Sequence, residues 1–189
     1  MVEEAKTYKI IAISGSLRAN STNTGLIRLA REIVPRAQIE IADIRDVPVY
    51  DGDIEASTGV PEKVKILGEK ILAADGVFLC SPEYNYGPSA CTKNIIDWLS
   101  RINPIPLKGK PMAIGTVSAG PSCGYRAQYD IRKYLLFLQP HVMNFPDCAV
   151  SENYLKFDMQ TGDFKADEKV EKMLPTFFEA FFQHIDWVK

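Results

Sequence analysis

A short polar loop near the N-terminus has the residue types of an anion-binding site. It reads Gly15-Ser16-Leu17-Arg18-Ala19-Asn20-Ser21-Thr22-Asn23-Thr24. The loop leads into a predicted helix, whose first free N–H groups and positive dipole end favour an anion. The guanidinium of Arg18 matches phosphate oxygens, and Ser16, Ser21, Thr22 and Asn23 add short hydrogen-bonding side chains. The loop therefore predicts a phosphate site.

The pattern of this loop narrows the kind of phosphate. It is neither G-x-x-x-x-G-K-[ST] nor G-x-G-x-x-G, which argues against triphosphate hydrolysis and ordinary dinucleotide binding. A terminal monophosphate is the better match. The alternative is purely structural: Ser21 or Asn23 only caps the helix, as such residues very often do.

Two further loops have the residue types to contact a flat ring. The first reads Ser81-Pro82-Glu83-Tyr84-Asn85-Tyr86-Gly87-Pro88, and the second reads Ser118-Ala119-Gly120-Pro121-Ser122-Cys123-Gly124-Tyr125. Two prolines hold the first loop extended and leave its amides and carbonyls free for a polar ring edge, while its tyrosines offer aromatic surface. The small residues of the second let a ligand approach the backbone. The alternatives are a turn with two surface tyrosines and a flexible connection.

The elements that must position these loops alternate between strand and helix patterns. Strands are predicted over 8–14, 38–42, 76–80, 111–117 and near 142–150, and helices through 26–33, over 61–74, from Pro88 through Leu99, over 126–138 and over 167–187, with a long connection over 43–59. This alternation predicts an α/β fold with a parallel sheet covered on both faces. Such sheets bind ligands outside the carboxyl ends of their strands, where all three loops lie. Phosphate and planar-ring sites at one edge suggest a mononucleotide such as FMN.

Composition limits the class of protein further. The length of 189 residues, without repeats or linkers, predicts a single domain over 1–189. A net charge of −2 argues against a nucleic-acid binder. The sequence shows no secretory signal and no apolar window of a membrane span. Four scattered cysteines, without zinc-ligand spacing, indicate a reduced, cytoplasmic protein and no metal site.

Three segments together resemble a known family. They are Ser14-Gly15-Ser16-Leu17-Arg18 with Ser21 and Asn23, then Pro82-Glu83-Tyr84-Asn85-Tyr86, then Lys93-Asn94 to Asp97-Trp98-Leu99-Ser100-Arg101. In order and spacing they resemble the NADPH-dependent FMN reductase family, especially its quinone and chromate reductase branch. The resemblance implies a flavodoxin-like three-layer fold, with a five-stranded parallel sheet in the order 2-1-3-4-5 and FMN at the point where strand order reverses.

The resemblance also implies roles for particular residues. Those implied to hold the FMN phosphate are Ser16, Arg18, Ser21, Thr22 and Asn23; those implied to border the isoalloxazine are Pro82, Glu83, Tyr84, Asn85 and Tyr86; Ser118 belongs to the third flavin loop. It implies a homodimer or homotetramer in which a neighbouring subunit helps to wall the flavin.

The expected reaction is a two-step exchange in which NADPH, or NADH, reduces the flavin and leaves before the acceptor binds. The acceptor would be a quinone or a similar small molecule, with chromate, azo compounds and free flavin also open. Neither His141 nor His184 lies in a predicted site loop, so the sequence predicts no histidine acid–base catalysis and indicates no catalytic residue. The alternatives are a flavodoxin-type electron carrier and a flavin-free binding module.

Residues outside the three loops allow further predictions. Arg126 and Tyr129 share a helix face and would meet a neighbouring subunit, the nicotinamide phosphate or water. Cys91 and Cys123 lie near the loops, but without a resolving partner they are expected to act as small apolar residues. The aromatic residues of the last helix are expected to pack on the sheet. These are Phe177, Phe178, Phe181, Phe182 and Trp187.

Overall fold

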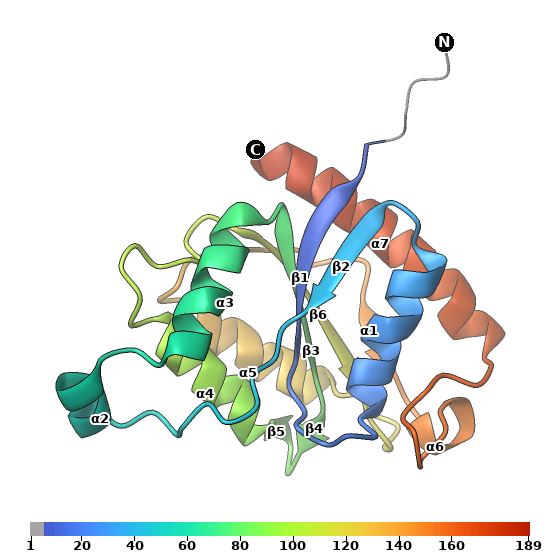
Figure 1. The fold of residues 1–189 in the computed structure, drawn as a ribbon. Helices are drawn as coiled ribbons and strands as arrows, with labels where there is room; N and C mark the ends of the chain where they lie inside the picture. Colours follow the sequence, from blue (N-terminus) through green and yellow to red (C-terminus); the bar gives the residue numbers. More distant parts are fainter. Residues whose placement is uncertain (1–5) are drawn as a thin grey trace.

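The computed structural model describes residues 6–189 and contains a parallel sheet between two layers of helices (Figure 1). Neighbouring strands of the sheet are β2 (Ala37–Ile41), β1 (Tyr8–Ser14), β3 (Gly76–Ser81) and β6 (Pro111–Val117), and both β7 (His141–Val142) and β8 (Cys148–Val150) pair with the free side of β6. All of these pairings are parallel. The predicted flavodoxin-like order is confirmed, with two short strands sharing the fifth position.

The division of the fifth strand corrects the prediction of one strand near 142–150. After β7 the chain leaves the sheet, and it returns at Cys148. Pro146 lies in the interruption and has no N–H to donate to a strand ladder. The sheet therefore has six strands rather than five.

Helices cover the two faces of the sheet in different groups (Figure 1). One face carries α1 (Thr22–Ile33) and α7 (Glu168–Val188), and the other carries α3 (Glu62–Ala73), α4 (Ala90–Leu99) and α5 (Tyr125–Leu135). Buried apolar residues form one cluster under each group. Because strands β3 and β6 are buried along their whole length, their sequences are predominantly apolar.

Two short helices and one helix start differ from the predictions. The expected connection over 43–59 contains α2 (Gly52–Thr58), and α6 (Asn153–Lys156) follows β8. Neither helix buries a residue, so neither needs the periodic apolar residues from which a helix is predicted in a sequence. Pro88 does not open α4; it lies in a short strand, and Ser89 caps the helix by accepting from the Thr92 N–H.

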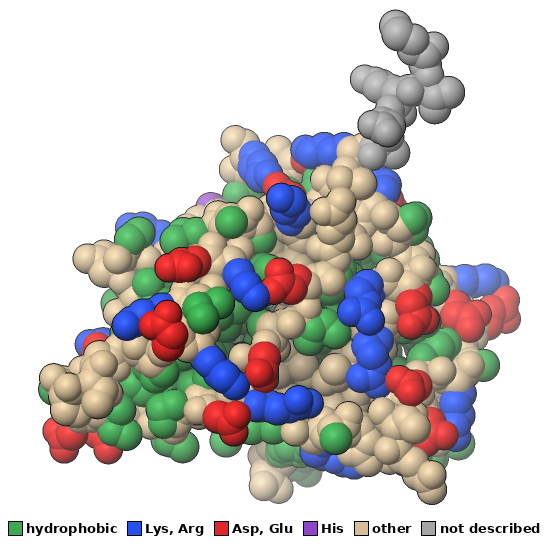
Figure 2. Space-filling view, in the orientation of Figure 1, with side chains coloured by type: hydrophobic (Ala, Val, Ile, Leu, Met, Phe, Trp, Pro, Cys, Tyr) green, Lys and Arg blue, Asp and Glu red, His purple; other side chains and the backbone are tan. Residues whose placement is uncertain are grey.

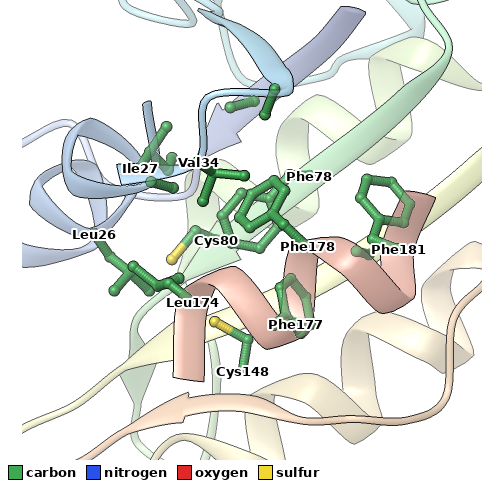
Figure 3. Close-up of a cluster of buried hydrophobic side chains, with 14 of the residues drawn as sticks. Leu26, Ile27, Val34, Phe78, Cys80, Cys148, Leu174, Phe177, Phe178 and Phe181 are labelled. Atoms are coloured by element: carbon green, nitrogen blue, oxygen red, sulfur yellow. The ribbon is translucent and has the colours of Figure 1, made fainter. Parts of the chain in front are cut away.

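The aromatic residues of α7 form much of the core on its face of the sheet (Figure 3). Phe177, Phe178 and Phe181 are at most 1% exposed, and the ring of Phe178 lies 5.4 Å from that of Phe78 on β3. The prediction of a packed terminal helix is confirmed for the phenylalanines. It is wrong for Trp187, which is 79% exposed because it lies on the outer face of the last turn.

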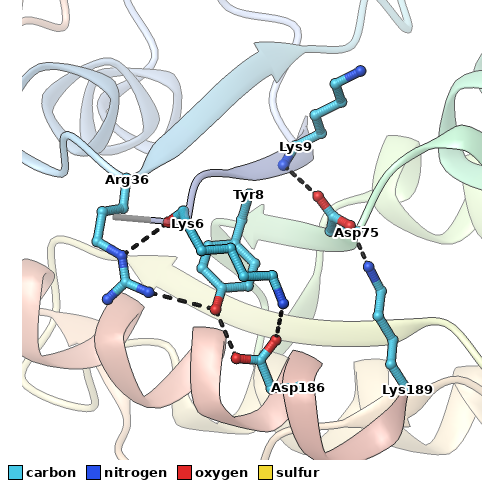
Figure 4. A network of polar contacts seen from close by, with 7 residues as sticks. All are labelled: Lys6, Tyr8, Lys9, Arg36, Asp75, Asp186 and Lys189. Atoms are coloured by element: carbon cyan, nitrogen blue, oxygen red, sulfur yellow. Dashed lines mark hydrogen bonds and ion pairs between the residues drawn. The ribbon is translucent and has the colours of Figure 1, made fainter. Parts of the chain in front are cut away.

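Polar residues tie the last turn of α7 to β1 at the end of the sheet opposite the site loops (Figure 4). The buried Tyr8 donates its hydroxyl to Asp186 Oδ2 at 2.7 Å, and Lys6 Nζ donates to Asp186 Oδ1 at 2.5 Å. These two bonds lower the pKa of Asp186.

Within residues 6–189, no helix is long and apolar enough to cross a membrane.

Replacing Asp186 by asparagine is expected to lower the free energy of unfolding by about 1 kcal/mol or less at pH 7, because the carboxylate is half exposed. The carboxyl pKa is lower in the folded protein, so its stabilising contribution is complete above the unfolded value of about 4 and disappears as pH falls through the folded value. Urea unfolding at pH 7 and pH 3 measures this. An equal loss at both pH values would contradict the ionic role of Asp186.

Candidate functional site

A pocket of about 370 Å³ opens at the edge of the sheet where β1, β3 and β6 end. It is lined by the three predicted loops and by the segment after β8. Its lining residues are Ser16, Arg18, Ser21, Thr22, Asn23, Pro82, Glu83, Tyr84, Val117, Ser118, Ala119, Gly120, Asn153 and Met159. Hollows of about 570 and 610 Å³ lie along β2 and beside the start of α7, away from these loops. Convergence of the loops, rather than size, therefore identifies the site.

The first loop rests on a buried group of hydroxyls. Gly15 has no room for a side chain, because a Cβ there would lie 2.0 Å from Thr92 Oγ1. Its carbonyl accepts a hydrogen bond from Ser89 Oγ at 2.5 Å, and Thr92 Oγ1 lies 2.9 Å from both Ser89 Oγ and Ser81 Oγ. These contacts hold the start of the first loop against the loop after β3, and they place Arg18 at the pocket.

The N-terminus of α1 meets the pocket with a cap and a buried amide. Ser21 Oγ accepts from the Thr24 N–H at 3.3 Å, so the capping alternative holds for Ser21. It does not hold for Asn23, whose Oδ1 accepts from the Val117 N–H and whose Nδ2 donates to the Val117 carbonyl, both at 3.0 Å. Oδ1 also accepts from the Cys80 thiol. The Asn23 side chain thus joins α1 to β3 and β6 and fixes the helix N-terminus at the pocket.

The loop after β3 folds as a small hairpin rather than as a simple extended segment. Its strands are β4 (Glu83–Tyr84) and β5 (Gly87–Pro88), and the two turn residues Asn85 and Tyr86 have φ of 50° and 69°. Such left-handed pairs form the tight turn that suits a hairpin's twist. Asn85 and Tyr86 are the only predicted site residues that do not line the pocket, because they occupy the tip of this hairpin.

An ion pair joins this hairpin to α5. Arg126 Nη1 lies 2.6 Å from Glu83 Oε1, and the Arg126 N–H donates to Glu83 Oε2 at 3.2 Å. The guanidinium also lies 4.0 Å from the centre of the Tyr86 ring, and Ser122 Oγ donates to Glu83 Oε1. Arg126 therefore pairs with a carboxylate of its own chain. The three partners considered from sequence were a neighbouring subunit, the nicotinamide phosphate and water, and none of them was this contact. Tyr129 is exposed.

Replacing Arg126 by alanine is expected to lower the free energy of unfolding by about 1–3 kcal/mol, because it leaves the buried Glu83 carboxylate without its cation. The Glu83→Gln change alone should cost less, and in the double variant it should restore part of the loss. Urea unfolding of the four proteins gives the coupling energy. Additive losses would show that the two side chains act independently.

A segment far along the chain closes the pocket on its remaining side. We call residues 153–164 the strap. Asn20 Nδ2 donates to the Met159 carbonyl of the strap at 2.8 Å. A Cβ at Gly25 of α1 would lie 1.9 Å from the Gly162 carbonyl oxygen, so helix and strap touch backbone to backbone. Sequence reasoning missed both strap residues of the pocket, Asn153 and Met159, since no motif connects the strap with the first loop.

The fold and the pocket together define a class. This is a flavodoxin-like α/β protein whose nucleotide-type pocket lies where the strand order reverses between β1 and β3. The model of the NADPH-dependent FMN reductase family matches residues 8–154, and the chain belongs to that family. It is thus an oxidoreductase with FMN as cofactor and NAD(P)H as reductant.

Individual relatives agree with this assignment over nearly the whole chain. A quinone reductase of Escherichia coli K12 is 40% identical over 188 residues, covering 98% of this chain and 99% of that protein. The NAD(P)H-dependent FMN reductase PA1204 of Pseudomonas aeruginosa is 41% identical over 169 residues, covering 88% and 91%. Among solved structures, the flavoenzyme NAD(P)H:(acceptor) oxidoreductase FerB of Paracoccus denitrificans superposes with a TM-score of 0.81 at 30% identity, covering 96% of this chain and 97% of that one.

The chemistry of the pocket residues fits FMN. The first loop and the α1 N-terminus contribute free backbone amides, the hydroxyls of Ser16 and Thr22 and the cation of Arg18, which together suit a phosphate. From the loop after β3, Pro82 and Tyr84 offer backbone groups and an aromatic surface to a planar ring. Asn153 of the strap also lines the pocket and donates Nδ2 to Thr22 Oγ1 at 3.0 Å.

Proposed function

We propose that this protein catalyses two-electron reduction of a quinone-like acceptor by NADPH, with FMN held in the pocket at the ends of β1, β3 and β6. The overall change is NADPH plus quinone plus a proton giving NADP⁺ plus hydroquinone. When bound, FMN would supply the redox chemistry, the transfer of a hydride from NADPH and of two electrons to the acceptor. The observation that carries the proposal is that one pocket is lined both by the phosphate-type residues of the first loop and by the residues of the two loops suited to a planar ring.

The residues of the chain bind and orient the cofactor in this proposal. Those proposed to hold the phosphate are Ser16, Arg18, Ser21, Thr22 and Asn23, and those proposed to border the ring are Pro82, Glu83, Tyr84, Asn85, Tyr86 and Ser118. Asn23 contributes through its backbone N–H, because its side chain is fully engaged with Val117 and Cys80. Asn85 and Tyr86 would contact the ring from the hairpin tip, outside the pocket lining.

A ping-pong order follows if both substrates use the same face of the ring. Initial rates measured for NADPH against a benzoquinone should give parallel lines in double-reciprocal plots. Converging lines would contradict the two-step exchange while leaving the reductase activity in place. The same assay, run with NADH and then with chromate, an azo dye or free FMN as acceptor, ranks these substrates.

The mixed charge of one face and the low net charge of −2 favour an enzyme over an electron carrier. Carriers commonly dock through a face of one charge, whereas basic and acidic side chains are interspersed over the face in Figure 2. Ion pairs such as Lys70–Glu40 and Lys63–Asp43 bring opposite charges together at the surface. A yellow protein that consumes NADPH with a quinone supports the enzyme. A yellow but inert protein would indicate the carrier, and a colourless one the flavin-free module.

We also propose a homodimer or homotetramer in the cytoplasm. Exposed aromatic residues gather on the hairpin, which contributes Glu83 and Tyr84 to the pocket, and on α5, which the Glu83–Arg126 ion pair joins to it. They are Tyr84, Tyr86, Tyr125 and Tyr129. Grouped exposed aromatic surface is typical of an interface, and the four free cysteines suit a reducing compartment. Light scattering of the purified protein measures the mass; a monomer would contradict the proposed assembly.

A further inference from the structure

Two buried polar side chains, Thr116 and Gln128, lie behind the third loop (residues 118–124) and do not line the pocket. Thr116 belongs to β6 and is 0% exposed, and Gln128 belongs to the first turn of α5 and is 4% exposed. Buried polar side chains in folded proteins are hydrogen-bonded, because an unpaired one costs the fold its full desolvation. Their partners therefore show which segments these two side chains join.

The two side chains form one directed chain of hydrogen bonds. Gln128 Nε2 donates to Thr116 Oγ1 at 3.0 Å and to the Cys148 carbonyl of β8 at 3.1 Å. Thr116 Oγ1 donates to the carbonyl of Cys123, near the end of the third loop, at 2.7 Å. A hydroxyl has a single hydrogen, so the bond that Thr116 accepts from Gln128 leaves this hydrogen directed at Cys123.

The end of the third loop also fits closely on Thr116. Gly124 has a φ of 83°, and a Cβ there would lie 2.6 Å from Thr116 Cβ. The N–H of Gln128 donates to the Gly124 carbonyl at 3.2 Å as α5 begins. At the other end of the loop, the Ser118 N–H donates to the Val150 carbonyl at 2.9 Å. The loop is thus fixed to the sheet at both ends, and the two buried side chains fix the second end.

The segment that they fix also holds the hairpin. Ser122 Oγ donates to Glu83 Oε1 at 3.2 Å, and Arg126 Nη1 lies 2.6 Å from the same oxygen. Glu83 lines the pocket, and so do residues 118–120 of the third loop. Both segments suited to a planar ring are therefore held in place by the residues around the start of α5.

We propose that Thr116 and Gln128 are positioning residues for the flavin ring, which act by fixing the third loop and, through Glu83, the hairpin. Neither side chain touches the cofactor. The first loop is held by separate bonds, at the Gly15 carbonyl and at the Asn23 side chain, so the phosphate contacts do not depend on this pair. The inference rests on the proposed function, since it concerns how the FMN site binds the ring.

The test is the affinity of flavin-free protein for FMN and for riboflavin, which lacks the phosphate, measured by quenching of flavin fluorescence. Thr116→Val keeps the shape of the side chain and removes its hydroxyl. It should weaken both ligands by the same factor, about three- to tenfold, as expected for one lost hydrogen bond. Thr116→Ser keeps the hydroxyl, so its affinity for both ligands should stay within about twofold of wild type.

Gln128→Leu carries the same prediction from the other side chain, and it serves as the test if Thr116→Val fails to fold. It removes the donor and nearly keeps the volume, so both flavins should again bind about three- to tenfold more weakly. The double variant should lose less than the product of the two single losses, because both changes break one chain of bonds. Losses that multiply fully would show that the two side chains do not act together.

Ile131→Val is the matched control for a general loss of stability. Ile131 lies on the same helix as Gln128, is fully buried and belongs to the core cluster beneath α3, α4 and α5. Removing one buried methylene should lower the melting temperature, while the affinity for both flavins stays within about twofold of wild type. If Ile131→Val weakens both ligands as much as Thr116→Val at a similar melting temperature, stability alone explains the effect and the positioning role is overturned.

The remaining outcomes separate this inference from the proposed function. If wild-type protein binds no flavin, the proposed function fails, and the positioning role fails with it. If wild type binds FMN and Thr116→Val matches its affinity, only the positioning role is overturned. A loss of FMN affinity with unchanged riboflavin affinity would assign the effect to the first loop and would also overturn it.

Discussion

Replacing Arg18 by alanine should weaken FMN binding by about 10- to 100-fold and leave riboflavin binding within about twofold of wild type. The expected loss corresponds to about 1.5–3 kcal/mol, the usual range for a hydrogen bond to a charged group. The physical reason is that Arg18 supplies the one full positive charge among the residues that line the pocket, and riboflavin lacks the phosphate that this charge would meet. Fluorescence titration of flavin-free protein with both ligands measures the two affinities.

The matched control for this change is Arg45→Ala. Arg45 is also an exposed arginine, and it lines a neighbouring hollow beside Ser16 and Leu17 without lining the candidate FMN pocket. Removing it deletes the same charge from the same region, so FMN binding should stay within about twofold. If Arg18→Ala weakens riboflavin as strongly as FMN, Arg18 shapes the loop instead of binding phosphate.

The strands of the sheet were predictable because burial imposes a pattern on their residues. Strands β1 and β6 match their predicted bounds, and β3 differs by one residue at its end. A parallel sheet covered on both faces requires apolar side chains along each central strand, and that requirement is visible in sequence. The short strands β7 and β8 carry too few residues to show it, so the prediction merged them.

The loops of the site were predictable for a topological reason. In a parallel sheet the carboxyl ends of the strands lie at one edge, so the loops after β1, β3 and β6 meet wherever they are in sequence. Their residue types then indicated that the first loop suits a phosphate and that the other two suit a planar ring. What could not be inferred was the path of each loop, such as the turn that takes Asn85 and Tyr86 to the hairpin tip.

Contacts between distant segments left no signal in the sequence. The bond from Asn20 to Met159 spans 139 residues, and the pair of Glu83 with Arg126 spans 43. No periodicity or motif relates such positions, because each is fixed only when the whole sheet has formed. The strap and the ion pair therefore emerged from the structure alone, although both border the predicted site.

The contact between Gly25 and Gly162 gives the second large expected effect. Gly25→Ala should weaken FMN binding by at least about tenfold and lower the free energy of unfolding by about 1–2 kcal/mol. Alanine is favoured over glycine inside a helix by about 1 kcal/mol, but overpacking costs about 1–3 kcal/mol or more. The clash is with a backbone carbonyl, which cannot rotate away as a side chain could. We expect the clash to outweigh the gain in helix propensity and to displace the strap from the first loop, residues 15–24.

Gly52→Ala separates the gain in helix propensity from the cost of overpacking. Gly52 also lies in a helix, α2, but no atom lies within 4 Å of a Cβ built there. Its alanine variant should be as stable as wild type or more stable by up to about 1 kcal/mol, with unchanged FMN affinity. Urea unfolding and FMN titration of both variants make the comparison. A Gly25→Ala protein that matched Gly52→Ala in both measurements would show that neither stability nor FMN binding depends on the close contact between Gly25 and Gly162.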